Sequence, residues 1–127
     1  MKQLLVIYLF LVSMTISSAN AAPVYVFPVV GCKATYAKAH HDYQATDIQA
    51  AAGCKYVAPI GGTITEVSAK DVWSWKNNFG DTRGGLSVTL VGDDGVRYYG
   101  SHFKKIEPGI EPGVVVVAGQ TLAYVGA

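Results

Sequence analysis

Residues 86–101 read Leu-Ser-Val-Thr-Leu-Val-Gly-Asp-Asp-Gly-Val-Arg-Tyr-Tyr-Gly-Ser, two runs of strand-forming residues around a polar, glycine-containing turn. The predicted strands are Leu86 to Val91 and Val96 to Ser101, and the turn is Gly92-Asp93-Asp94-Gly95. Gly and Asp dominate hairpin turns because they tolerate the positive φ angles that such turns need. The stretch therefore predicts an antiparallel hairpin, and with it a β fold.

The same alternation of short apolar runs and turn residues continues on both sides of this hairpin. Further strands are predicted at Val24 to Val30 (interrupted by Pro28, hence an edge strand or strand end), Lys55 to Ala58, Thr63 to Val67, Val114 to Val117 and Thr121 to Val125. The last two flank a tight turn at 118–120 and resemble a second hairpin. Helix is expected to be minor, at most one turn near Asp47 to Ala52. We expect an all-β, mainly antiparallel domain with long loops at Lys33 to Thr46 and Ser68 to Gly85.

The first 21 residues have the pattern of a secretory signal peptide. Lys2 precedes an apolar run from Leu4 to Leu11, and Ala19-Asn20-Ala21 forms an Ala-x-Ala cleavage site. The run is too short to cross a bilayer, which takes about 20 residues. We therefore expect export to the periplasm, the cell wall or the medium, and a mature domain of residues 22–127 with no membrane span.

The charge of this mature domain excludes one class of partner. Removal of Lys2 from the ten basic residues leaves nine, which balance the nine acidic residues. No basic surface for nucleic acid or for anionic lipid is expected.

Cysteine usage agrees with export. Cys32 and Cys54 form an even pair, which in an oxidising compartment predicts a disulfide. Two buried thiols or half of a metal site are the alternatives, but neither cysteine belongs to a Cys-x-x-Cys motif. A disulfide closing such a loop should contribute roughly 3 kcal/mol.

The densest group of chemically active side chains lies at residues 40–47, His-His-Asp-Tyr-Gln-Ala-Thr-Asp. Imidazole and carboxylate are the ligands expected for a catalytic zinc ion. In an extended chain, residues an even number apart face the same side, so His41 would share a face with Asp47 while His40 would point away. His40 remains an alternative to His41, and a solvated polar loop is the alternative to a metal site.

Two other candidates lie further along the chain. His102 is at the end of a predicted strand, where an ordinary surface histidine is the competing interpretation. Trp73, Trp75 and Asn77 lie in the second long loop, where they would contact sugar or a peptide, or else cover the core.

The order of these motifs resembles that of the LytM/lysostaphin-type zinc metallopeptidases, the peptidoglycan endopeptidases of bacterial cell walls. The matching segments are His41 to Asp47-Ile48, Gly53, Ala58 to Ile64, Gly100-Ser101-His102-Phe103, and Pro112-Gly113-Val114 to Leu122. The resemblance covers most of residues 24–126. It implies the lysostaphin-like (duplicated-hybrid-motif) fold.

The resemblance also implies a function, that of a hydrolase with peptidoglycan as its partner. It implies one zinc ion with His41 and Asp47 as ligands, and His102 as a catalytic residue that steadies developing charge or the attacking water. Tyr43, Trp73 and Trp75 would be candidates for the substrate groove.

Two departures from the family pattern bear on activity. The usual spacing is His-x-x-x-Asp, whereas Tyr43 stands four residues before Asp47, and the histidine comes from two residues further back. Family members also carry a His-x-His motif shortly after the glycine that matches Gly126, and one of those histidines is the third zinc ligand. That motif is absent here, so we expect a C-terminally truncated domain with an incomplete zinc site and no activity of its own.

Two other functions compete with the peptidase. A degenerate, non-catalytic member of the family would bind cell wall or regulate other hydrolases. A biotinyl- or lipoyl-like accessory domain would suit the hairpin at Val114 to Val125, but it would need a lysine in the tight turn, and it would leave His41 and Asp47 without a role.

Overall fold

The computed structural model describes residues 21–40, 43–76, 79–80 and 82–126. The predicted signal peptide lies outside the described residues, apart from Ala21. The described residues contain no helix, which confirms the predicted all-β, mainly antiparallel class, and thus none forms an apolar helix long enough to cross a membrane. Their strands are β1 (Val29–Val30), β2 (Ala34–Tyr36), β3 (Ile48–Ala50), β4 (Lys55–Val57), β5 (Gly62–Ser68), β6 (Leu86–Gly92), β7 (Arg97–Ile106), β8 (Val115–Val116) and β9 (Thr121–Val125).

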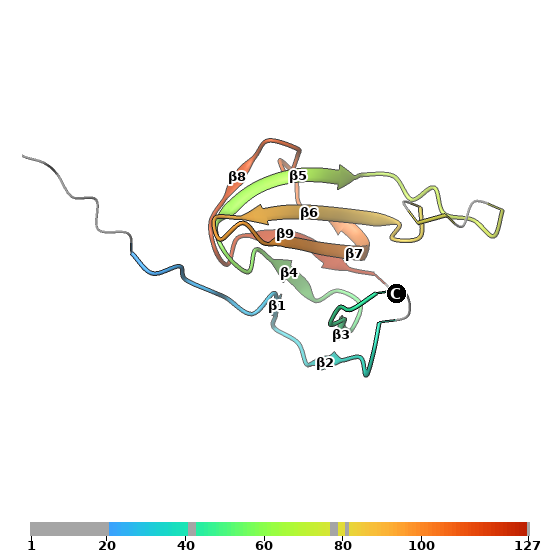
Figure 1. The fold of residues 1–127 in the computed structure, drawn as a ribbon. Helices are drawn as coiled ribbons and strands as arrows, with labels where there is room; N and C mark the ends of the chain where they lie inside the picture. The colour runs from blue at the N-terminus through green and yellow to red at the C-terminus, as the bar shows by residue number, and fades with distance from the viewer. Residues whose placement is uncertain (1–20, 41–42, 77–78, 81, 127) are drawn as a thin grey trace, which may run out of the picture.

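These strands form one large sheet and one small ribbon (Figure 1). The order in the large sheet is β1-β4-β9-β7-β6-β5-β8, with antiparallel pairing throughout, and β2 pairs with β3 separately. The edge strands β1 and β8 are only two residues each, and short edges limit unwanted pairing with other chains. The loop that follows β5 projects from one end of the sheet (Figure 1).

The hairpin predicted at residues 86–101 is confirmed. β6 pairs with β7 in the register Val91↔Arg97 and Leu90↔Tyr98, and Gly95 in the turn has a φ of 77°. β7 runs beyond the predicted end to Ile106, because its second half pairs with β9, with Phe103 opposite Val125.

The second predicted hairpin is wrong, although its turn is present. Gln120 N–H donates to Val117 O, but β8 pairs with β5 whereas β9 lies between β4 and β7. The reason is the segment after β4, because Ala58 N–H donates to Gln120 O and Ala58 O accepts from Gly119. The chain at Ala58 thus takes the hydrogen bonds at this turn, and the two flanking strands join different neighbours.

Three further local predictions are corrected. In place of the helical turn expected near Asp47 to Ala52, the chain forms strand β3. This strand pairs with β2, with Ile48 opposite Tyr36. β2 lies in the stretch Lys33 to Thr46, which was predicted to be a loop. Isoleucine, threonine and tyrosine favour this pairing. The predicted strand at Val24 to Val30 shrinks to β1.

The core lies on one face of the large sheet. It contains Ile64, Val88, Leu90 and Leu122, each fully buried, and the stacked rings of Tyr56 and Phe103, whose centroids are 5.1 Å apart. Because side chains alternate along a strand, the neighbours of these core residues point to the opposite face. That opposite face, over β5, β6 and β7, is polar.

The predicted disulfide is present and joins Cys32, between β1 and β2, to Cys54, next to the start of β4. The two Cα atoms are 5.8 Å apart, and Cys54 is buried. The disulfide therefore ties the β2–β3 ribbon to the large sheet.

Candidate functional site

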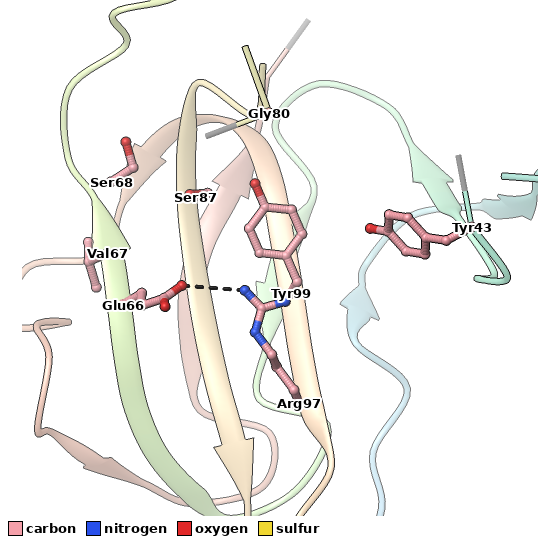
Figure 2. A pocket seen from close by; sticks show the side chains of 8 residues that line it. All are labelled: Tyr43, Glu66, Val67, Ser68, Gly80, Ser87, Arg97 and Tyr99. Atoms are coloured by element: carbon pink, nitrogen blue, oxygen red, sulfur yellow. Dashed lines mark hydrogen bonds and ion pairs between the residues drawn. The ribbon is translucent and has the colours of Figure 1, made fainter. Parts of the chain in front are cut away.

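A groove of about 430 Å³ lies on the polar face of the sheet (Figure 2). We call it the sheet-face groove, and its lining residues are Tyr43, Glu66, Val67, Ser68, Gly80, Ser87, Arg97 and Tyr99. Six of these come from β5, β6 and β7, whereas Tyr43 and Gly80 come from the two long loops. Sequence reasoning singled out Tyr43 and missed the charged residues.

Strand register builds the floor of this groove. Glu66 pairs with Thr89 on β6, and Thr89 pairs with Tyr99 on β7, so the three side chains form one row across three strands. The intervening residues Val88 and Leu90 face the core. The alternation of polar and apolar residues in each strand is a period-two signal that could have located this face.

An ion pair crosses the floor of the groove. The Arg97 Nη2 atom lies 3.3 Å from Glu66 Oε2 and 3.3 Å from Thr89 Oγ1. The Thr89 hydroxyl in turn donates to the same carboxylate oxygen at 3.1 Å. Thr89 is only 2% exposed, so a buried hydroxyl anchors two side chains that are themselves 58% and 70% exposed.

Tyrosines form the walls of the groove. The guanidinium of Arg97 lies over the ring of Tyr99, 5.4 Å from its centroid, which is within the range of a cation–π contact. Tyr43 projects toward Tyr99 from outside the sheet (Figure 2). Gly84 makes room for this wall, because a Cβ atom at that position would collide with the Tyr99 hydroxyl.

His102 lies on an irregular part of β7. The β6–β7 register shifts between Leu86 and Val88, and His102 has a φ of 57°, the left-handed region. Its N–H donates to Gly84 O at 2.7 Å, and its carbonyl accepts from Gly126. Phe103 is buried and a Cβ at Gly100 would meet its ring, so both positions face the core, and the exposed His102 lies between them.

The predicted metal ligands are only partly described. His41 lies outside the described residues. Asp47 is half-buried directly before β3, and its carbonyl accepts from Ala37 N–H at 2.9 Å. The alternative ligand His40 accepts the Tyr43 N–H on Nδ1 at 3.3 Å and stacks its ring against Tyr43, at 4.0 Å between centroids.

The alternation argument for His41 stays a prediction, because residues 41–42 lie outside the described residues. Tyr43 and Gln44, which follow them, form a bend. The described residues therefore do not decide between His41 and His40.

The described residues do not fit a zinc ion by themselves. Among them, no group of three His, Cys, Asp or Glu side chains is placed to hold a metal.

The tryptophans of the second loop lie apart from the groove lining. Trp73 and Trp75 contact each other edge to face, with centroids 5.3 Å apart, and are 41% and 87% exposed. The Asp71 carboxylate accepts the Trp73 N–H at 3.0 Å. They do not cover the core, and Asn77 lies outside the described residues.

No protein-family model and no curated protein matches the chain. Among solved structures, the chain is similar to the NMR solution structure of lysostaphin, with a TM-score of 0.53 and 25% sequence identity. The match covers 74% of this chain and 38% of the lysostaphin chain, so this chain spans well under half of that protein's length. The domain therefore has a lysostaphin-like fold.

Proposed function

We propose that this chain is a lysostaphin-like domain that binds peptides of bacterial peptidoglycan along the sheet-face groove, as the substrate-binding part of a zinc endopeptidase. The observation that carries the proposal is the groove itself. It is open, it lies on the polar face of a rigid sheet, and it is walled by two tyrosines with hydrogen-bonding hydroxyls. Its volume is in the range of binding sites for small ligands.

The catalytic part of the proposal rests on the motif resemblance. His41 and Asp47 would be two of the zinc ligands, and His102 would be the catalytic histidine. A bound zinc ion would supply Lewis-acid chemistry and an activated water. The 127 residues include only His40, His41 and His102 as histidines, and none forms the family's His-x-His motif. We therefore expect these residues alone to bind the wall without cutting it.

The chain beginning at Ala22 can be tested with purified peptidoglycan and added zinc. We expect the protein to sediment with the wall and to release no new peptide amines. Absence of sedimentation would overturn the binding function, and release of amines by these residues alone would overturn the incomplete site.

Zinc content, measured by mass spectrometry after equilibrium dialysis, tests the ligands. His41→Ala and Asp47→Ala should each lower the weak zinc uptake, and His40→Ala is the matched control that should retain it. Unchanged uptake in both variants would remove these residues as ligands, and a loss confined to His40→Ala would transfer the role to His40.

The alternative of a non-catalytic module has one observation in its favour, the exposed Trp73–Trp75 pair. Paired exposed aromatic rings are typical of surfaces that contact sugars or peptides. This function would be preferred if a version of the domain that carries all the zinc-ligating residues of the family still bound the cell wall without cleaving it.

A further inference from the structure

We propose that the sheet-face groove holds a peptide group carrying both a free ammonium and a free carboxylate, with Arg97 receiving the carboxylate and Glu66 the ammonium. This inference rests on the proposed peptide-binding function and names its ligand chemistry. Neither residue belongs to the motifs that carry the family resemblance.

Both charged side chains have hydrogen-bonding atoms that the described residues leave unused. Arg97 uses its Nη2 atom for Glu66 and Thr89, and within the described part of the chain Nη1 and Nε make no other hydrogen bond. Glu66 uses Oε2 for both of its contacts, and its Oε1 makes none there. One donor edge and one acceptor atom therefore remain available to a ligand.

The Arg97 and Glu66 side chains are held in place although they are exposed. Arg97 is fixed from below by the buried Thr89 hydroxyl and from the side by the Tyr99 ring. Figure 2 shows the Glu66 carboxylate and the Arg97 guanidinium on opposite sides of β6, with their ion pair crossing that strand. An exposed ion pair contributes little to stability, so the pair is poorly explained as a stabilising device.

The opposite charges of Arg97 and Glu66 favour a ligand that carries both charges. A ligand with only a carboxylate would gain Arg97 but face repulsion from Glu66, and a ligand with only an amine would meet the reverse. A group with both charges satisfies both residues at once, and Arg presents a planar fork that matches a carboxylate. The Tyr43 and Tyr99 hydroxyls at the walls would hydrogen-bond the adjoining peptide amide.

The test uses the dipeptide alanyl-alanine, its N-acetylated form and its C-terminal amide, titrated into the folded chain and followed by amide NMR shifts. We expect the free dipeptide to shift groove residues and each blocked form to bind about tenfold more weakly, as loss of one charge-assisted hydrogen bond would produce. Equal binding of all three forms, or no shifts in the groove with the free dipeptide, would overturn the inference.

Three variants assign the partners. Arg97→Gln should abolish the preference for a free carboxylate, so that the free dipeptide and its amide bind equally. Glu66→Gln should abolish the preference for a free amine. Arg97→Lys should give an intermediate preference, since it keeps the charge and loses the planar fork.

Lys104→Gln and Glu111→Gln are matched controls, because both residues are exposed and neither lines the groove. Both should keep the full preference, and an equal loss in the controls would contradict the assignment. Failure of this inference is distinguishable from failure of the proposed function. Wall binding that persists without any dipeptide preference would contradict only the inferred ligand chemistry. Loss of wall binding would contradict both that inference and the proposed function.

Discussion

At the scale of single residues, the site depends on positions whose neighbours in the fold are remote in sequence. His102 and Tyr43 could be selected as candidates because histidine and tyrosine are chemically informative wherever they occur. Glu66 and Arg97 could not be selected, because a charged residue in an exposed strand position is ordinary until its partner is known. Their meeting depends on register across three strands.

His102 carries the first prediction at this scale. It has a φ of 57°, where a side chain with a Cβ costs roughly 1–2 kcal/mol and glycine has no steric cost. His102→Gly should therefore be about 1 kcal/mol more stable than His102→Ala, as measured by urea unfolding.

Both His102 variants lose the imidazole, so both should bind peptidoglycan to the same extent if the histidine acts in catalysis and not in binding. An alanine variant as stable as the glycine variant would mean that the bulge relaxes when the imidazole is removed.

At the scale of elements, the turn of the β6–β7 hairpin is fastened by one carboxylate. Asp94 accepts the Val96 N–H at 3.0 Å, the Tyr98 hydroxyl at 2.8 Å and the Tyr25 hydroxyl at 3.0 Å. Tyr25 belongs to the segment before β1, so the hairpin turn also holds the N-terminal segment. We call these three residues around Asp94 the hairpin clasp.

The clasp predicts a loss of stability at alkaline pH. Burial, and then the hydrogen bond to Asp94, raise the pKa of Tyr98 to about 12. Burial alone raises the pKa of Tyr56 to about 12. A pKa raised on folding adds stability below the ordinary value of 10.0, and this stability is lost as pH rises toward about 12. The unfolding free energy, measured against pH, should fall across this window.

Tyr98→Phe should make that alkaline fall shallower, since one of the phenols whose pKa is raised on folding is gone. Tyr56→Phe should do the same without touching the clasp. An unchanged slope in both variants would mean that other groups dominate the alkaline transition.

The same clasp predicts an effect at the acid limb. The hydrogen bond from the Val96 N–H is the largest influence on the pKa of Asp94 and lowers it, and desolvation, the second largest, opposes it. The Tyr98 and Tyr25 hydroxyls lower it further, so the pKa of Asp94 lies below its usual 3.8. Its stabilising effect is therefore present above about that pH and is lost as pH falls through the lowered pKa. Asp94→Asn should flatten this acid limb and lower stability at neutral pH.

At the scale of the whole molecule, the disulfide is a covalent cross-link, in addition to the backbone, at the junction of the ribbon and the sheet. It joins residues 22 positions apart, and removing it should lower the unfolding free energy by roughly 3 kcal/mol. The double variant Cys32→Ala/Cys54→Ala should show this loss in urea unfolding, with a matching loss for the parent chain after reduction. A loss well below 1 kcal/mol would indicate that the ribbon is held by other contacts.

Reduction should leave the groove residues on β5, β6 and β7 in place, because none of them is connected through the disulfide. The dipeptide preference is therefore expected to survive reduction while the protein remains folded. Tyr43 is the exception, since it lies on the loop between β2 and β3.

Local chemistry was enough to determine the all-β class, the hairpin at residues 86–101 and the pairing of the only two cysteines. Turn preference and side-chain alternation act over a few residues, so they can be read from neighbours in the chain. Tertiary structure decided what those signals do not contain. It placed β8 and β9 beside different strands, formed a strand after Asp47, and brought Glu66, Thr89 and Arg97 into contact. Strand partners are chosen by which arrangement buries the most apolar surface over the whole sheet, and this sum is not present in any short segment.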